Sequence, residues 1–496
     1  MRSEKKRYRS DDHTSPHPDN GPDEYLDRIM SGVRLSHKET ALLRSDVREA
    51  LDYMISEGLS AGQAYERIGC DIFGRFYTEP DRDEWYPLDS AAKIYPLSMT
   101  RQKMSIYRIA ANMTDPVVPQ LLRLALHSTI KRFPTFATIL KRGLFWHYLD
   151  ARRKRFVIEP ETEMPCAPIK LSTRNDQVFR VIYFRNRISM EVFHCVADGY
   201  GAMFFFRTLL AEYLRLKGYR IPQSDDIADI NSVPDSGEFE DSFGLTDDIG
   251  ETVGYGQGQA IHISGKRTNW QPAQVLHFVM PARSLVAAAK KEGTTVSGLI
   301  LAAMMLAAKA AYRGEKKDGC FKVQLPVDMR QHYPSKTLRN FSMYAIIKVP
   351  YSSVGNLCDV VPIINDQMRT ETGKESLDRM AAMTKKLVAN PAIRFIPLGL
   401  KRIIISRIAH LATGKSFTGV LSNIGLVRTD FAGGIESFEA VSGPSRSNQI
   451  GCALVSHRDT AVLSVTKHTM DHSFECKLYD VLSAMDINIT VEGNEP

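Results

Sequence analysis

The chain lacks any long apolar run. None of its segments holds about 18 consecutive apolar residues, the length that a membrane-spanning helix needs. The best candidate, residues 395–412, is interrupted by a proline and three basic side chains: Pro397, Lys401, Arg402 and Arg407. Residues 1–25 are polar, with neither an apolar core nor a small-residue cleavage site, so they predict a disordered tail rather than a signal peptide. We therefore expect no transmembrane segment.

Cysteine is sparse and follows no binding or disulfide pattern. The seven cysteines form no C-x-x-C pair and no compact framework: Cys70, Cys166, Cys195, Cys320, Cys358, Cys452 and Cys476. Scattered thiols are typical of a reducing compartment, so we expect a cytoplasmic protein.

Strong charge of one sign is also missing. The net charge of +7 is modest for 496 residues, and the basic residues do not gather into long runs. A nucleic-acid partner is therefore not expected. The slight positive excess suits an anionic co-substrate, such as one that carries a nucleotide. The share of hydrophobic residues, 43%, excludes a disordered or fibrous chain.

The length exceeds what one hydrophobic core usually supports, so two core-sized units are expected. Residues 221–265 contain no Lys or Arg but many Asp, Gly and Ser, which predicts an acidic, poorly ordered linker. The composition thus divides the chain into a tail (1–25), a helical N-terminal extension (26–94), a first half (95–220), the linker (221–265) and a second half (266–496).

Both halves mix strands with helices. In the first half, hydrophobic periodicity predicts strands at 105–113, 143–149, 155–159, 179–184 and 188–194, and a helix from Thr114-Asp115-Pro116 to about residue 131. In the second half it predicts strands at 275–280, 321–327 and 343–349, and helices at 282–291 and after Thr295. The fold class expected is α/β, with two mixed-sheet halves and a channel between them.

The stretch "MEVFHCVADGYGAMFFFRTLLAEYL" places His194, Asp198 and Gly199 where a strand ends and a helix begins. A histidine can take a proton from a hydroxyl or amine and return it to a leaving group. Strand alternation points Cys195 to the opposite face, which weakens its claim as a nucleophile. Asp198 is expected to cap the helix or pair with a distant arginine, and Gly199 to let the backbone approach a substrate. A core histidine beside a capping aspartate is the alternative.

This H-x-x-x-D-G stretch resembles the acyltransferase superfamily of the chloramphenicol acetyltransferase fold, which includes alcohol acetyltransferases, plant BAHD enzymes and nonribosomal-peptide condensation domains. Two later segments are similar to further motifs of that superfamily: "PVDMRQHYPSKTLRNFSMYAI", with Asp328, Arg330 and Asn340, and "TGVLSNIGLV", with Ser422, Asn423 and Gly425. Phe193 stands where condensation domains have a second histidine, and the D-F-G-W-G motif of plant enzymes is missing. Bacterial alcohol-acetyltransferase-like proteins are the nearest likeness.

The resemblance implies that His194 is the general base and that Asp198 pairs with an arginine, for which Arg330 is the candidate; a surface charge is the alternative for Arg330. It further implies that Ser422 donates to the oxyanion, unless it is only a turn residue, and that Asn340 and Asn423 fix turns. The reaction would move an acyl group from acyl-CoA to an alcohol or amine in one step, with no metal, bound cofactor or covalent intermediate.

Two other functions stay open: a condensation-type acyltransferase that takes its donor from a carrier protein, and a non-catalytic binding protein on the same fold. The absence of a carrier domain disfavours the first, and the intact H-x-x-x-D-G motif disfavours the second.

Several further patterns are weak. "TGKS" at 413–416 lacks the first glycine of a phosphate loop, and "GYGQGQ" at 254–259 has no preceding strand. His468, Asp471 and His472 could bind a metal, but an echo of the first-half motif explains them more simply. The basic amphipathic stretch at 398–412 favours a helix packed on a sheet over peripheral contact with a membrane.

Overall fold

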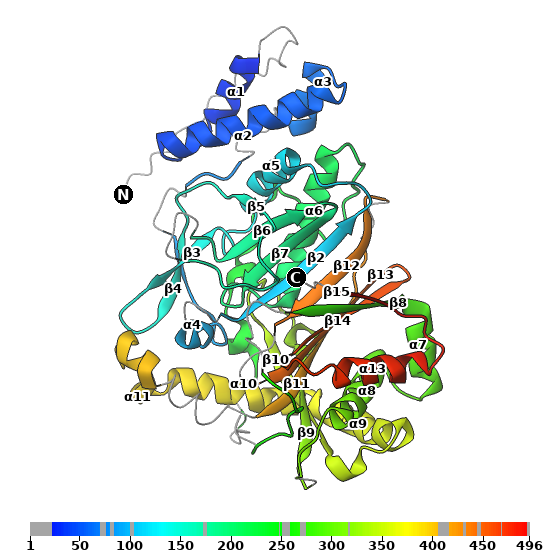
Figure 1. Cartoon of the computed structure of the whole chain (residues 1–496). Coiled ribbons are helices and arrows are strands. Elements are labelled where there is room, and N and C mark those ends of the chain that lie inside the picture. Colours follow the sequence, from blue (N-terminus) through cyan, green and yellow to red (C-terminus); the bar gives the residue numbers. More distant parts are fainter. Residues whose placement is uncertain are drawn as a thin grey trace.

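A computed structural model describes residues 22–69, 76–79, 84–99, 104–171, 176–247, 249, 258–267, 274–315, 318–404, 416–429, 433–443, 448–467 and 469–493. Within these ranges the chain folds into a five-stranded sheet, a seven-stranded sheet and a small three-stranded sheet, with helices packed around them (Figure 1). The α/β class expected from the sequence is confirmed.

The five-stranded sheet carries the first half. Its strand order is β12 (Ile435–Ser442), β2 (Ile106–Met113), β7 (Arg187–Phe193), β6 (Phe179–Phe184) and β5 (Ile158–Pro160). Strand β12 comes from the second half and pairs antiparallel with β2. The two halves of the sequence are therefore joined by backbone hydrogen bonds within one sheet.

The seven-stranded sheet carries the second half. Its order is β10 (Ser342–Pro350), β9 (Cys320–Asp328), β11 (Phe417–Leu426), β13 (Asn448–His457), β14 (Thr460–Lys467), β8 (Val275–Pro281) and β15 (Thr490–Gly493). The second-half helices are α7 (Ala282–Lys291), α8 (Val296–Ala310), α9 (Leu357–Glu371), α10 (Lys374–Ala389), α11 (Pro391–Arg394) and α13 (Ser473–Ser483). The small sheet has the order β1 (Trp85–Pro87), β4 (His147–Ala151) and β3 (Thr138–Arg142).

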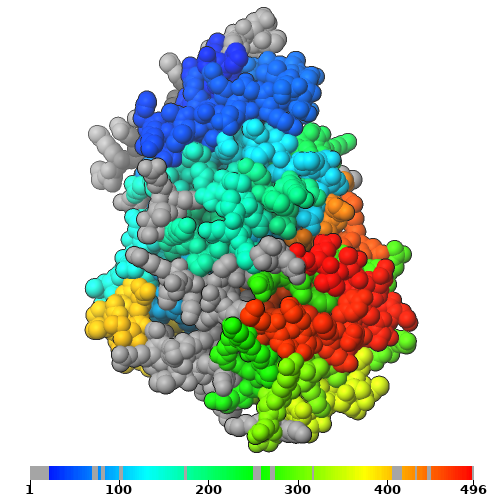
Figure 2. Space-filling view, viewed as in Figure 1, coloured from blue at the N-terminus to red at the C-terminus, as the bar shows by residue number. Residues whose placement is uncertain are grey.

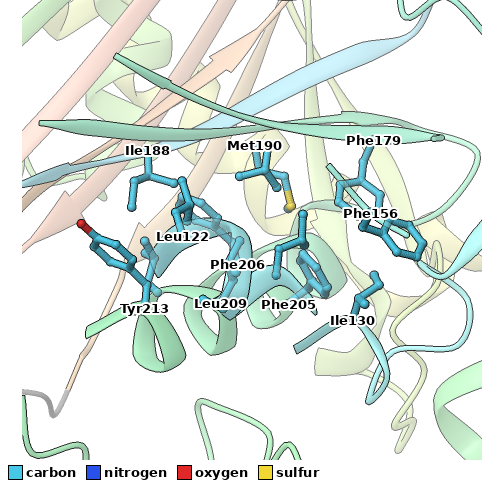
Figure 3. Packing of buried hydrophobic residues seen from close by; sticks show 14 of the residues in the cluster. Leu122, Ile130, Phe156, Phe179, Ile188, Met190, Phe205, Phe206, Leu209 and Tyr213 are labelled. Carbon is cyan, nitrogen blue, oxygen red and sulfur yellow. The ribbon is translucent and has the colours of Figure 1, made fainter. Parts of the chain in front are cut away.

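Helix α6 (Gly199–Leu216) packs beside α5 (Pro119–Ile130) on one face of the first sheet. Alternate residues of β7, Ile188 and Met190, point toward Phe206 and Leu209 of α6 (Figure 3). This apolar layer fixes the position of the helix that follows the H-x-x-x-D-G motif. Helix α5 begins at Pro119, not at the Thr114-Asp115-Pro116 cap expected from the sequence, because Pro119 occupies its first turn.

The N-terminal helices α1 (Pro22–Met30), α2 (His37–Ser56) and α3 (Ala61–Ile68) rest on the first half (Figure 2). Buried Asp46 of α2 joins them to it, since its carboxylate accepts from Arg123, His127 and Arg155 at 2.8–3.0 Å. Three cationic or hydrogen-bonding partners offset much of the free-energy cost of removing this carboxylate from water, which an isolated carboxylate could not do.

Residues 221–247 of the acidic linker are folded, whereas the composition predicts poor order for this segment. Residues 221–247 contain two short 3-10 helices, η1 (Ser236–Phe239) and η2 (Ser242–Leu245), with the Phe243 side chain fully buried. Glu238 accepts both arms of the Arg132 guanidinium at 2.7 Å. The composition of the linker does not predict this fold, because the charge that compensates Glu238 belongs to Arg132. This arginine follows α5 and is 106 residues away in the sequence.

No single helix in the described ranges is long and apolar enough to cross a bilayer. Helices α7 and α8 reach that length and apolar content only when taken together, and a bend of 80° separates them.

We predict that Glu238→Ala lowers the free energy of unfolding by about 3–5 kcal/mol, because it leaves the buried Arg132 guanidinium without its carboxylate. Urea denaturation followed by fluorescence measures this change. Lys336→Ala removes a solvent-exposed ion pair to Asp235 of the same segment and serves as the control, with a much smaller effect. Equal denaturation midpoints for the two variants would contradict the structural role of Glu238.

Candidate active site

His194 follows directly after β7 and meets residues from three separate parts of the sequence. Its Nδ1 lies 3.0 Å from Oδ1 of Asn340, in the second half. Its ring stacks on Tyr95 of α4 (Tyr95–Ser98), with centroids 4.7 Å apart, and contacts Tyr107 of β2 at 4.8 Å. The imidazole is partly buried. The histidine of the motif is therefore not enclosed in the core of one half.

The Asn340 amide fixes the tautomer of His194. Its Nδ2 donates to the His194 backbone carbonyl and to Oδ2 of Asp89, each at 3.1 Å. With both amide hydrogens directed to acceptors, Oδ1 is the atom that faces the imidazole. The His194 Nδ1 must then carry the ring proton, which leaves Nε2 with a free lone pair. The sequence suggested only a turn-forming role for Asn340.

Asp89 holds this amide in place. Its carboxylate is fully buried and also accepts from the Ala92 backbone N at 2.7 Å. Burial raises its pKa, while Arg339, with Nε 3.8 Å away, acts in the opposite direction. Asp89 and Tyr95 were both missed in the sequence. The only local signal is an aspartate in a turn, whose carboxylate accepts from a backbone N–H three residues later, and nothing local connects it to Asn340, 251 residues later.

Asp198 and Arg330 form the predicted ion pair, with Nη1 and Oδ2 2.9 Å apart. Asp198 also caps α6 through the Gly201 N–H at 3.1 Å and accepts from the Phe341 N–H at 2.8 Å. The Arg330 side chain is buried, so it is not a surface charge. Burial lowers its pKa, but Asp198 and Asp328 raise it further, so the guanidinium stays charged.

The Arg330 guanidinium additionally donates to the carbonyls of Thr337 and Arg339, at 3.0 and 2.8 Å. It thereby fastens the 337–341 loop of the second half to the first turn of α6. Asn340 lies within this fastened loop, between the two residues, Arg339 and Phe341, that contact the ion pair.

Gly201, rather than Gly199, is the glycine that lets helix α6 lie close to the backbone of the 337–341 loop. A Cβ at residue 201 would lie 1.9 Å from the Leu338 carbonyl oxygen. A Cβ at residue 199 would have nothing within 4 Å. Gly199 therefore borders open space at the helix N-terminus, and its expected role in letting the backbone approach a substrate stays a prediction.

Ser422 and Asn423 lie on β11 of the seven-stranded sheet. Ser422 pairs in register with Ala453 of β13, and no contact with His194 is found for it among the described residues. Asn423 does form a turn: its Oδ1 accepts from the Gly425 N–H at 2.9 Å, where Gly425 has φ +82° and the strand bulges. Its Nδ2 donates to Ser297 at the start of α8, at 2.8 Å.

Burial lowers the pKa of His194 below its ordinary value of 6.5, with the Asn340 hydrogen bond and the Asp198 charge acting in the opposite direction. The imidazole is thus neutral at pH 7, with Nε2 able to accept a proton. Burial raises the pKa of the Cys195 thiol well above its usual value. This thiol is fully buried and unreactive.

The weaker sequence patterns give no competing site. His468, residues 254–257 and residues 413–415 lie outside the described part of the chain, in which no cluster of three or more metal-ligating side chains occurs. Asp471 pairs with Arg313 at 2.7 Å. A cavity of about 240 Å³ lies at the edge of the first sheet, where Glu161, Gln177 and Arg180 line it, and not at His194. The open channel between the halves stays a prediction.

No protein-family profile matches the chain, and no curated protein matches it by sequence. Three solved structures resemble it. The trichothecene 15-O-acetyltransferase from Fusarium sporotrichioides has a TM-score of 0.54 and 13% identity, over 83% of this chain and 98% of that one. Polyketide synthase associated protein 5 from Mycobacterium tuberculosis has a TM-score of 0.54 and 11% identity, over 81% and 98%. The first condensation domain of the CDA synthetase has a TM-score of 0.53 and 13% identity, over 82% and 99%.

The matches cover nearly all of these three proteins, so the likeness extends over the whole two-half architecture. The chain has the fold shared by chloramphenicol-acetyltransferase-like proteins and condensation domains. At 11–13% identity the comparison defines the fold, and the chemistry must be argued from the residues around His194.

We predict that Gly201→Ala destabilises the protein by about 1–3 kcal/mol, since the added methyl group meets backbone that cannot move without breaking the Arg330 contacts. Gly199→Ala is the matched control in the same helix turn, and its melting temperature should equal or exceed that of the wild type. Differential scanning calorimetry of both variants decides the point. Comparable melting temperatures for the two would show that α6 and the 337–341 loop are not in close contact.

Proposed function

We propose that the protein is an acyltransferase that moves an acyl group from a CoA thioester to a hydroxyl or amine acceptor, with His194 as general base. The observation that carries this proposal is the Asn340 contact, which favours the tautomer with the proton on Nδ1 and so leaves Nε2 able to accept a proton. An alcohol-acetyltransferase-like reaction fits this arrangement. The free cysteines and a CoA donor both suit a cytoplasmic enzyme.

In the proposed step, His194 Nε2 takes the proton of the acceptor O–H or N–H as the acceptor atom bonds to the thioester carbonyl carbon. The tetrahedral intermediate then collapses, the C–S bond breaks, and the CoA thiolate receives the proton from the imidazolium. Atoms and charges balance without a covalent enzyme intermediate. Asp198 and Arg330 would act by positioning the loop that carries Asn340.

Ser422 is the proposed donor to the oxyanion. The described residues give its hydroxyl no hydrogen-bond partner, and β11 places it on the strand whose Ile424 packs against the first-half core. Oxyanion contacts of this kind often contribute about 3 kcal/mol to the transition state.

A condensation-type reaction with a carrier-bound donor is the second candidate, because condensation domains share the fold. The general base and its supports would be the same in both reactions. Only the thiol carrier of the acyl group differs, so the donor must be tested directly.

We predict that wild-type protein releases free thiol from acetyl-CoA or longer acyl-CoAs in the presence of pooled alcohols and amines, and that His194→Ala lowers the rate by about 10²- to 10⁴-fold. The base must be neutral, so kcat/KM should rise with pH through the pKa of His194 and then level. Because burial lowers this pKa, the midpoint of the rise should lie below pH 6.5. A thiol-reactive dye measures the rates across the pH range.

Comparing wild type with His194→Ala, and acyl-CoA with an acylated carrier protein, separates the candidate functions. Turnover with an acylated carrier protein but not with acyl-CoA would favour the condensation-type reaction. Equal rates for wild type and His194→Ala would exclude His194 as the base. Acceptor binding by calorimetry without turnover on either donor would favour a non-catalytic binding protein.

We predict that Asp89→Asn lowers kcat about hundredfold, because an amide at this position no longer dictates which way the Asn340 amide turns. The KM for the acyl donor should change little, since Asp89 is fully buried. Nitrogen-15 NMR of the imidazole should report Nδ1 protonation in the wild type and a mixed tautomer in the variant. Ser90→Ala is the control, because Ser90 bonds to the linker residue Asp241 and not to Asn340. An unchanged tautomer with reduced kcat would contradict the positioning role.

A further inference from the structure

The helical segment at residues 398–404 buries its lysine and exposes its apolar side chains. Lys401 is fully buried, whereas Leu400, Ile403 and Ile404, which share one face of the turn, are 57%, 55% and 43% exposed. The Lys401 ammonium lies 3.5 Å from the centre of the Trp146 ring and donates to the Phe145 carbonyl at 2.8 Å. A helix packed on a sheet, as the sequence favoured, would bury the leucine and isoleucines and expose the lysine.

The turn is joined to the loop between β3 and β4, and the two segments form what we call the apolar lobe (residues 143–146 and 395–404). The Leu398 N–H donates to the Leu144 carbonyl at 2.9 Å, and the Phe145 and Phe395 rings meet edge to face at 5.8 Å. Leu144 and Phe395 are themselves 71% and 61% exposed. In Figure 1 the lobe lies at one corner of the molecule, around α11 and the tip of β4.

The lobe is bordered by positive charge. Residues 385–404 contain four basic residues besides the buried Lys401, and no acidic one. Residues 139–147 add Arg142, while the nearby Lys141 is paired with Asp150. Exposed aliphatic and aromatic side chains surrounded by lysine and arginine are the composition of a surface that inserts shallowly into an anionic bilayer. An acidic protein partner would complement the positive charge, but it would not account for several aliphatic side chains that the helical turn exposes to solvent.

We propose that the apolar lobe docks the protein onto the anionic phospholipid surface of a membrane. The lobe is also connected to the candidate active site, because Arg402 donates to the Met99 carbonyl at 3.1 Å, directly after α4, whose Tyr95 stacks on His194. If the proposed acyl transfer holds, on which this step rests, docking brings the α4 side of the site to the lipid surface, and the acceptor or acyl chain is lipophilic.

Vesicle flotation tests the docking with the full chain. Wild type should float with vesicles of phosphatidylcholine and phosphatidylglycerol, float poorly with phosphatidylcholine alone, and be released by high salt. The double variant Phe395→Ser/Ile403→Ser should lower the partition coefficient at least tenfold. The matched control is Val286→Ser/Val491→Ser, which removes two exposed valines from α7 and β15 and should float as wild type does. Far-ultraviolet circular dichroism verifies that both double variants are folded.

These outcomes separate the docking proposal from the proposed acyl transfer. Failure of wild type to float, equal flotation with neutral vesicles, or equal flotation of the lobe variant would overturn the proposal. Binding to an acidic acyl carrier protein in place of vesicles, lost in the lobe variant, would overturn it in favour of a protein partner. His194→Ala should float as wild type does. Thiol release without flotation would thus refute docking and leave the acyltransferase, whereas flotation without turnover would refute the acyltransferase and leave docking.

Discussion

The buried pair of Asp198 and Arg330 is the interaction on which the site depends. Each ion is removed from water, and such a pair is stable only when its remaining hydrogen-bonding positions are also filled. Here they are filled by the backbone: Asp198 accepts from Gly201 and Phe341, and Arg330 donates to the carbonyls of Thr337 and Arg339. The hydrogen bonds that the charges require are therefore the same ones that fasten the loop to the helix.

The orientation of His194 follows from that arrangement. Asn340 stands between Arg339 and Phe341, whose backbones both contact the ion pair, so the backbone on either side of Asn340 is held in place. The acidic linker also restrains the loop. Its carbonyls at Glu238 and Glu240 accept from the Leu338 backbone and the Thr337 hydroxyl, at 3.0 and 2.8 Å. A segment whose composition suggested disorder thus completes the support of the site.

Local sequence patterns predicted the local features of the structure and little else. The sequence predicts strand β6 and helix α7 at their observed bounds, because each has a clear hydrophobic period and unambiguous ends. The predicted start of α5 is wrong, since Pro116 and Pro119 give the same signal three residues apart. For residues 398–404 the sequence predicts a helix with its apolar side packed on a sheet, and the structure differs for another reason. Its apolar content is evident in the sequence, but the side that faces solvent depends on Phe145 and Trp146, far away in the chain.

The residues of the candidate site also fall into those that the local sequence predicts and those that it does not. His194 and Asp198 lie within five residues of each other, so their spacing alone carried the hypothesis of a base beside a helix cap. Asp89, Tyr95 and the Asn340 contact arise only when three distant segments meet. Their chemistry is common, and no spacing rule connects them. Residues that position a catalytic group are for this reason harder to predict than the group itself.

The charges around His194 are balanced so that the imidazole stays neutral. A carboxylate in direct contact with Nδ1 would favour the imidazolium and raise its pKa. In this site the amide of Asn340 stands between Asp89 and the ring, and Arg339 lies 3.8 Å from the Asp89 carboxylate. Asp198, the other nearby anion, is paired with Arg330. Both negative charges are thus compensated by arginines of the second half, and burial can lower the pKa of His194 despite them. The same loop that orients the imidazole therefore also keeps its Nε2 free to accept a proton.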